Sequence, residues 1–184
     1  MLNYFRAKFT KRKFITGLGA QSIVSSKRAL LYYKTEPLII PRAAFDYKHT
    51  NSWEITEIVR ILNTYGFIVD VIDRSANNFI PEDKYNLFIG LGAGNSGKHF
   101  AKYAEVLKKA CIILYAAGPE PNISNALVEE RYDQFFERTG FKAPYMRTIT
   151  EIDFEKFSKL TDCFFCIGEY DSFSLDTYKK YNKP

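Results

Sequence analysis

Short apolar runs alternate with amphipathic stretches along most of the chain from Arg28 onward. The apolar runs are rich in β-branched and aromatic residues, which predicts buried strands. Between them, apolar residues recur at spacings of three and four, which predicts helices. The expected strands are 29–33, 67–72, 87–90, 111–115 and 163–167, with an extended piece at 37–41, and the later expected helices are about 99–109, about 124–139, 154–160 and about 174–181.

The first helix has the most complete start and stop signals. Asn51 is the predicted N-cap, Glu54 stands three residues later as in a capping box, and Gly66 is the predicted stop. The expected buried stripe consists of Ile55, Ile58, Val59 and Leu62.

Repeated strand–helix units predict an α/β fold, a Rossmann-like parallel sheet flanked by helices. The chain has 184 residues, enough for one ordinary domain. We therefore expect a single domain at residues 28–184 and a basic N-terminal arm at residues 1–27. Ligands of such sheets bind beyond the carboxyl ends of the strands.

Composition narrows the class of protein. Apolar residues make up 46% of the chain and aromatic residues 16%, which excludes global disorder. Three cysteines are too few for a disulfide scaffold. Cys163 and Cys166 have metal-site spacing, but within a strand their side chains point to opposite faces, so we expect buried structural cysteines and no metal site.

Charge is distributed unevenly along the chain. Residues 1–35 contain eight basic residues and no acid, whereas all 21 acidic residues follow, against 18 basic ones. The body of the protein is therefore mildly acidic, and we expect no nucleic-acid partner.

The arm allows three interpretations. If residues 2–14 were helical, Leu2, Phe5 and Phe9 would form one apolar stripe flanked by basic residues, which suits an anionic membrane surface. A solvated basic tail and a cleaved organellar transit peptide fit the same composition.

The segment from Gly92 to Lys98 fits the phosphate-binding pattern G-x-x-x-x-G-K between a predicted strand and helix. Gly92, Gly94, Asn95 and Lys98 are its candidate ligand-binding residues. His99 replaces the Ser or Thr that would hold magnesium. A tight glycine turn explains the same pattern, although even that turn leaves free N–H groups for an anion at the helix start.

Two further residues lie where parallel sheets bind ligands. Asp73 ends a predicted strand and is a candidate to accept hydrogen bonds from sugar hydroxyls, or simply to form a turn. His49 lies in a loop before the first helix and is a candidate general base, or an ordinary surface histidine.

Three stretches of the chain carry a resemblance to a known family. They are His49-Thr-Asn-Ser-Trp-Glu through Gly66-Phe-Ile-Val-Asp-Val-Ile-Asp73, then Tyr115-Ala-Ala-Gly118 with Asn122 to Arg131 and Glu137-Arg-Thr-Gly140, and Ile167 to Tyr178. Together they resemble the N-terminal domain of bacterial GT-B glycosyltransferases of the family 4-like group, from which Ala117 and Thr139 depart. The resemblance spans about residues 28–184.

The resemblance implies the acceptor-side half of an enzyme that moves a sugar from a nucleotide sugar to a glycan or lipid-linked acceptor. A C-terminal donor domain has no counterpart here, so the chain is expected to be a fragment or half-enzyme, to have little activity alone and to need no cofactor beyond the donor. His49 would be the catalytic base, and Asn51, Asp73, Gly92, Gly94, Asn95, Lys98, Gly118 and Asn122 would bind substrate.

The same resemblance implies a cytoplasmic protein that associates peripherally with the inner membrane face through residues 2–14. Two alternatives from other classes remain. One is a phosphate- or nucleotide-binding module that uses Gly92–Lys98, and the other is a non-catalytic docking protein.

Overall fold

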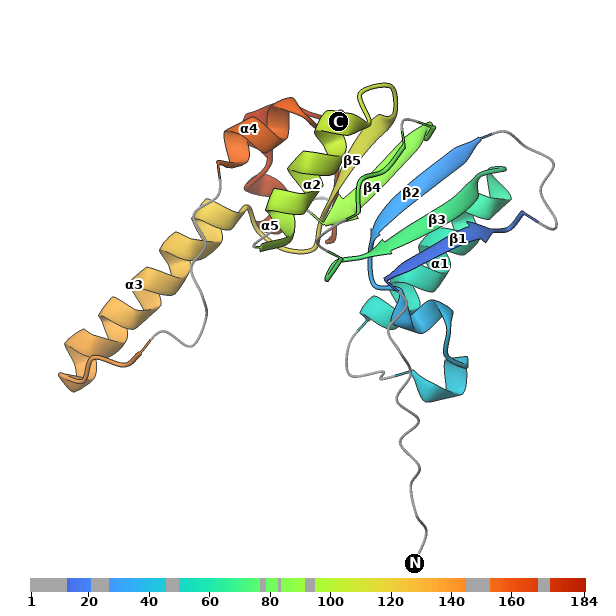
Figure 1. The fold of residues 1–184 in the computed structure, drawn as a ribbon. Coiled ribbons are helices and arrows are strands. Elements are labelled where there is room, and N and C mark those ends of the chain that lie inside the picture. Colours follow the sequence, from blue (N-terminus) through green and yellow to red (C-terminus); the bar gives the residue numbers. More distant parts are fainter. Residues whose placement is uncertain are drawn as a thin grey trace, which may run out of the picture. The chain divides into compact units, whose positions relative to one another are not determined.

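The computed structural model describes residues 13–20, 27–45, 50–76, 79–82, 84–91, 95–144, 153–168 and 173–184, without the side chains of residues 95–98. The chain divides into two units, Met1–Ala76 and Asn77–Pro184. Figure 1 labels their helices and strands. Each unit is described by itself.

Unit 1 is built on three strands and one crossover helix: β1 (Phe14–Leu18), β2 (Arg28–Tyr33), α1 (Asn51–Thr64) and β3 (Ile68–Asp73). Strand β3 lies between the other two, parallel to β2 and antiparallel to β1. Helix α1 connects the parallel strands and packs on β3. The core of unit 1 includes fully buried residues of β2, α1 and β3, among them Leu30, Ile55, Val69, Val71 and Ile72.

Helix α1 is confirmed, with corrections at its start. Thr50 is the N-cap and Asn51 is the first helical residue, so the predicted cap is wrong by one position. Glu54 consequently stands beyond the position that a capping box requires, and its backbone N–H donates to the carbonyl of Thr50 (2.9 Å). Gly66 ends the helix with a positive φ of 81°, as predicted.

The stripe that α1 buries differs from the prediction at one position. Ile55, Val59 and Leu62 are buried, whereas Ile58 is only half-buried and Ser52 is buried in addition. The buried face is therefore rotated slightly toward Ser52.

The prediction of an extended piece at 37–41 is wrong. Residues Glu36–Leu38 form a short 3-10 helix, η1, and Arg42–Ala44 form a second, η2. Pro37 stands in the first turn of η1, where its fixed φ is compatible with a helix and its missing N–H costs nothing. The backbone N–H of Leu38 closes the turn on the carbonyl of Thr35 (3.1 Å).

Strand β1 lies within the range assigned to the basic arm, and the sequence pattern did not predict it. Asp70 of β3 explains its attachment, because this buried carboxylate accepts a hydrogen bond from the Gly17 N–H on β1 (2.8 Å). Its other oxygen accepts from Arg28 Nη2 at the start of β2 (2.6 Å). One buried acid thus connects the middle strand to both of its neighbours.

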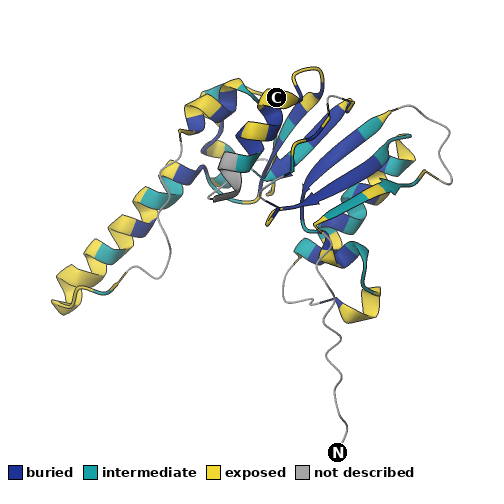
Figure 2. Ribbon diagram, in the orientation of Figure 1, coloured by how far each residue is buried: buried dark blue, intermediate teal, exposed yellow. Residues whose placement is uncertain are grey.

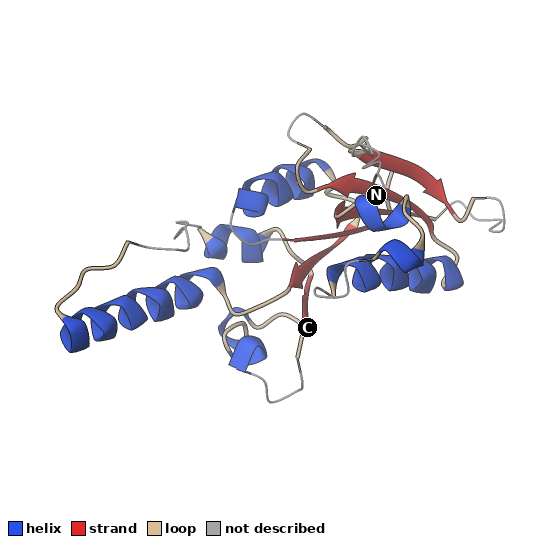
Figure 3. Cartoon of the chain, turned by 90° about the horizontal axis from the view of Figure 1, so that it is seen from below, coloured by secondary structure: helices blue, strands red, loops and turns tan. Residues whose placement is uncertain are grey.

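Unit 2 continues the strand–helix alternation: β4 (Leu87–Leu91), α2 (Asn95–Val106), β5 (Cys111–Ala116), α3 (Pro121–Thr139), α4 (Phe154–Lys159), β6 (Cys163–Cys166), α5 (Phe173–Asp176) and the 3-10 helix η3 (Lys179–Tyr181). Its strands are parallel, with β5 between β4 and β6. Figure 2 shows β4 and β5 largely buried, and Figure 3 shows the helices alongside the strands. The predicted fold class, α/β with a Rossmann-like parallel sheet flanked by helices, is confirmed.

Helix α3 differs from the other crossover helices in how little of it is buried. It begins at Pro121, ends at Gly140 with a positive φ of 67° and buries only Pro121 and Val128. Figures 1 and 3 both show it extending away from the strands of its unit. Its start precedes the predicted one by three residues, because Glu120 caps it through a hydrogen bond from the Ile123 N–H (3.0 Å).

The cysteines are free thiols, and the prediction that two of them are buried is wrong. Cys163 and Cys166 are half-buried and Cys111 is exposed. Within unit 2, β6 has a strand partner only on its β5 side, so one flank of it is less covered. Burial raises the pKa of all three thiols, with smaller contributions from Asp162 at Cys111 and Cys163 and from the Cys163 thiol at Cys166.

Candidate functional site

The carboxyl ends of β2 and β3 form one edge of unit 1, because the two strands are parallel and Tyr33 pairs with Asp73. Helix α1 begins at this edge, where the Tyr33 hydroxyl donates a hydrogen bond to Glu54 Oε2 (2.6 Å). Two predicted substrate-binding residues, Asn51 and Asp73, are therefore brought to the same edge. This is the position at which parallel sheets hold ligands.

Asp73 is buried and fully occupied by donors of the protein. Its Oδ2 accepts from the backbone N–H and the hydroxyl of Thr35 (both 3.1 Å). Its Oδ1 accepts from the N–H and the hydroxyl of Ser75 (2.9 and 2.5 Å). Burial acts to raise the pKa of Asp73, but these hydrogen bonds outweigh burial, so the pKa lies below its ordinary value. The contacts match the alternative interpretation of Asp73 as a turn-forming residue.

Glu54 is a candidate at the same edge that sequence reasoning assigned only to helix capping. Its carboxylate accepts from the hydroxyls of Tyr33 and Thr50. Trp53, the preceding residue of α1, is 56% exposed. The stretch His49-Thr-Asn-Ser-Trp-Glu contains both residues, and that stretch was the available signal.

Unit 2 has a second acid at the carboxyl end of a strand. Four residues after β5 ends, Glu120 precedes α3 and its side chain is completely buried. Its Oε1 accepts from the side-chain amide of Asn122 (2.9 Å) and from the Tyr181 hydroxyl (3.1 Å). Its Oε2 accepts from the Ile123 N–H, and Lys180 Nζ lies 3.8 Å away.

The C-terminal segment closes around this acid. The Glu120 N–H donates to Thr177 Oγ1 (2.9 Å), and the Tyr178 hydroxyl donates to the carbonyl of Gly118 (3.1 Å). Two predicted substrate-binding residues, Gly118 and Asn122, therefore meet in one hydrogen-bonded cluster with Glu120 and the tail. We call Gly118, Glu120, Asn122, Thr177, Tyr178, Lys180 and Tyr181 the Glu120 cluster.

The two tyrosines of the Glu120 cluster remain protonated to a higher pH than an ordinary tyrosine does. Burial raises the pKa of Tyr178 and of Tyr181, and the negative charge of Glu120 raises both further. Their hydroxyls are therefore hydrogen-bond donors at neutral pH. Tyr181 donates to the Glu120 carboxylate together with Asn122 and Ile123, whereas Tyr178 donates to the carbonyl of Gly118.

Sequence reasoning missed Glu120. Nothing in the local sequence predicts that Glu120 is buried, because an acid before a helix is normally an N-cap that faces solvent. Gly118 and Asn122, two residues to either side, were the nearest indications.

The other predicted site residues lie partly or wholly outside the described residues. His49, residues 2–12, and Gly92 and Gly94 lie outside them, as do the side chains of Asn95 and Lys98. The backbone of α2 begins at Asn95, so Gly92–Lys98 connects β4 to the first turn of α2. His99 is described: it is half-buried and stacks on Tyr103, with ring centroids 6.5 Å apart.

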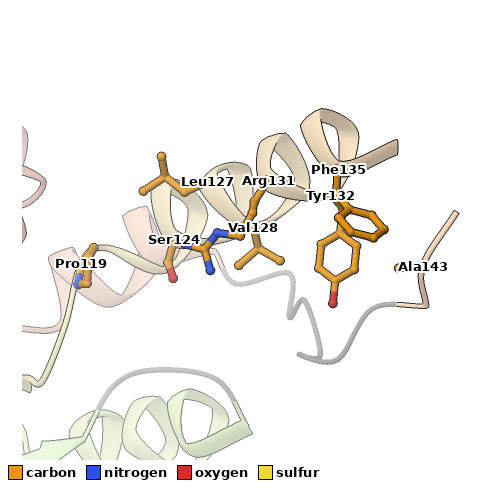
Figure 4. Close-up of a pocket in the computed structure, with 8 residues that line it drawn as sticks. All are labelled: Pro119, Ser124, Leu127, Val128, Arg131, Tyr132, Phe135 and Ala143. Carbon is orange, nitrogen blue, oxygen red and sulfur yellow. The ribbon is translucent and has the colours of Figure 1, made fainter. Parts of the chain in front are cut away.

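A groove of about 510 Å³ runs along α3. One wall consists of Ser124, Leu127, Val128, Arg131, Tyr132 and Phe135, and Pro119 and Ala143 lie at its margins (Figure 4). Most of these side chains are apolar, and Arg131 is the only charged residue among them. The sequence pattern did not predict this feature.

Two properties of the described part of the chain concern metal binding and membrane insertion. Among those residues, no group of three His, Cys, Asp or Glu side chains is arranged to hold a metal ion. None of the helices found there has the length and apolar character needed to cross a membrane.

Comparison with known proteins yields no relative. The chain matches no protein-family model, no curated protein and no solved structure at a significant level. Functional inference therefore depends on the residues and their geometry.

Proposed function

We propose that the chain is the acceptor-side half of a glycosyltransferase that moves a sugar from a nucleotide sugar to a glycan or lipid-linked acceptor. The observation that carries the proposal is the meeting of two of the resembling stretches. Gly118 and Asn122 come from one and Thr177 and Tyr178 come from the other. Hydrogen bonds join them at the carboxyl end of β5, partly through Glu120, which lies between Gly118 and Asn122.

The geometry of unit 1 adds support. The remaining resembling stretch supplies the start of α1 and the end of β3, with Asn51, Glu54 and Asp73 at one strand edge. In α/β folds this edge is where ligands bind. Residues around such an edge suit a polar, hydroxyl-rich substrate, since carboxylates and amides accept and donate several hydrogen bonds.

Under this proposal His49 is the general base and Asn51, Gly118 and Asn122 contact substrate. Asp73 has both carboxylate oxygens engaged by Thr35 and Ser75, so it positions the edge through those bonds. A donor domain supplies most contacts to the nucleotide sugar. The part of the expected membrane segment that precedes the strand, residues 2–12, attaches the enzyme to an anionic membrane surface, because Phe14 is the first residue of β1.

The test uses the natural gene product that contains this chain, with transfer measured from a panel of labelled nucleotide sugars to soluble and lipid-linked acceptors. Removing a general base typically slows turnover about 100-fold or more. We expect that loss in His49→Ala, and unchanged turnover in the matched control Lys48→Ala at the preceding position. Absence of transfer with every donor, or full turnover in His49→Ala, would contradict the proposal.

Trp53 provides a second readout that does not need the donor domain. It is the only tryptophan of the chain and is 56% exposed in the first turn of α1, which begins at the proposed site. We expect its fluorescence to change saturably with acceptor saccharides and to be unchanged by nucleotide sugars alone. A response to the nucleotide sugar alone would mean that this half holds the donor.

A phosphate- or nucleotide-binding module remains the second candidate, because Gly92–Lys98 joins β4 to α2 as the motif requires. It predicts magnesium-dependent binding of ATP or GTP by the chain alone. Calorimetric titration with Lys98→Ala, and Lys102→Ala as the matched control, distinguishes the candidates. Nucleotide binding that only Lys98→Ala abolishes would favour the second candidate over the first.

A further inference from the structure

One wall of the groove is a regularly spaced stripe of side chains on α3. Its six α3 residues, Ser124, Leu127, Val128, Arg131, Tyr132 and Phe135, follow spacings of three and four, so they share one face over about three turns. At about 1.5 Å per residue this face is about 16 Å long. It is long and narrow enough for an extended chain.

The face is open over much of its length. Leu127 is 40% exposed and Phe135 is 38% exposed, and Phe141 just beyond the helix is 62% exposed. Within α3 only Pro121 and Val128 are buried. The apolar surface of such a face remains in contact with water until a ligand or partner covers it, so binding there is favoured.

Charges on α3 are separated by face. At about 100° per residue, Glu129, Glu130, Asp133 and Glu137 lie on the side of the helix opposite the groove. Arg131 lies on the groove side, and its guanidinium reaches back toward Ser124 and Val128 (Figure 4). Among the described residues its guanidinium forms no hydrogen bond or ion pair, although four acids belong to the same helix. Among the described residues that line it, the groove therefore combines an apolar wall with one cation and no acid.

We propose that this groove binds a single-chain lipid with one phosphate head group. The chain lies along Leu127, Val128 and Phe135, and the phosphate pairs with Arg131. The planar guanidinium matches phosphate geometry with two parallel hydrogen bonds. If the proposed glycosyltransferase function holds, this lipid is the lipid-linked acceptor, and only that assignment rests on the proposed function.

The test titrates the 184-residue chain with dodecyl phosphate below its critical micelle concentration and measures binding by calorimetry. We expect saturable binding of one molecule per chain. Dodecyl maltoside carries the same chain without charge, and inorganic phosphate is the head group alone. We expect both to bind at least about tenfold more weakly, because each lacks one half of the recognition.

Variants separate the two halves of the site. Arg131→Gln should weaken dodecyl phosphate binding about tenfold or more. The matched control Lys102→Gln, at an exposed basic residue of α2 in the same unit, should change it by less than about twofold. Leu127→Gln should weaken dodecyl phosphate and dodecyl maltoside alike, since it removes part of the apolar wall. Thermal unfolding of each variant verifies that the fold is retained.

Several outcomes would overturn the proposal. They are no saturable binding of dodecyl phosphate, equal binding of dodecyl maltoside, or binding unchanged by Arg131→Gln. Sedimentation showing a dimer that Leu127→Gln dissociates would assign the face to a second copy of the chain instead. Because none of these measurements involves sugar transfer, lipid binding without transfer would contradict only the glycosyltransferase function.

Discussion

Asp73 and Glu120 are both buried acids at the carboxyl end of a parallel strand, yet they obtain their hydrogen-bond donors differently. Asp73 receives two from Ser75 in its own turn and two from Thr35 after the adjacent strand. Glu120 receives its donors from the first turn of α3 and from Tyr181, 61 residues further along the chain. One acid completes a turn, and the other connects a helix to the tail.

The difference concerns what each acid stabilises. The Asp73 bonds preserve the edge formed by β2 and β3, which are already paired along their length. The Glu120 bonds instead connect the start of α3, a helix with little buried surface, to residues 177–181. We therefore expect Glu120 to contribute more to the stability of the chain than Asp73.

The largest expected effect comes from Glu120→Ala. The substitution leaves the Tyr181 hydroxyl, the Asn122 amide and the Ile123 N–H without their acceptor. Asn122 is exposed and the other two donors are half-buried, so water can replace part of the lost acceptor. Hydrogen bonds to a charged group contribute about 1.5–3 kcal/mol, and we therefore expect the free energy of unfolding to fall by about 3 kcal/mol in total. Urea denaturation followed by circular dichroism measures it.

Glu129→Ala is the matched control, because Glu129 is an exposed acid on the same helix. Its effect should stay within about 0.5 kcal/mol. Equal effects of the two substitutions would mean that the Glu120 cluster does not stabilise the fold.

Asp73→Asn is expected to have an intermediate effect. An amide cannot accept from all four donors, and hydrogen bonds to charged groups contribute about 1.5–3 kcal/mol, so we expect a loss of about 2 kcal/mol at pH 7. Because the pKa of Asp73 is lower in the folded state, its stabilisation is complete above the ordinary aspartate pKa of about 3.9 and decreases as pH falls toward the folded value.

The measurement is urea denaturation of both proteins from pH 7 down to pH 3. The difference between wild type and Asp73→Asn should shrink as pH falls through that range. Asp133→Asn, an exposed position on α3, should show no such dependence. A constant difference across the range would disprove the assigned pKa direction.

Tyr181→Phe is expected to have the smallest effect, about 1 kcal/mol near pH 8, because one hydrogen bond to Glu120 is lost. The pKa of Tyr181 is raised in the folded state. Its contribution is therefore complete below the ordinary tyrosine pKa of about 10 and declines above it, where only the unfolded chain ionises.

Stability measured from pH 8 to pH 11 tests this expectation. Wild type should lose more stability over that range than Tyr181→Phe. Tyr65→Phe serves as control, since Tyr65 is 73% exposed. If Tyr65→Phe and Tyr181→Phe behave alike, burial of Tyr181 next to Glu120 has no energetic consequence.

Local signals in the sequence predicted much of the fold. The stops at Gly66 and Gly140 are correct, because a positive φ is available to glycine at little cost. The strands at 29–33 and 111–115 are correct to within a residue, because their apolar runs are short and continuous. The extended piece at 37–41 failed, because proline is compatible with a helical first turn as well as with extended chain.

The candidate site was predictable only in part. Asp73 was found from its place at the end of an expected strand, whereas Asn51, Gly118 and Asn122 followed only from the family resemblance. The structure describes Asp73 at the end of β3, Gly118 after β5, and Asn51 and Asn122 in the first turns of α1 and α3. Glu54 and Glu120 were not assigned a role at the site, because their significance lies in contacts with Tyr33 and Tyr181. Neither contact leaves a periodic pattern in the sequence.

The alternation of apolar runs and amphipathic stretches by itself determined the α/β class and the order of the main elements, since strand and helix periods are local properties. Tertiary structure alone decided that residues 14–18 become a strand, through the Gly17–Asp70 hydrogen bond across 53 residues. It also decided that Glu120 is buried, through Tyr181 and Thr177. In both cases a buried carboxylate needs donors, and folding supplies them from distant parts of the chain.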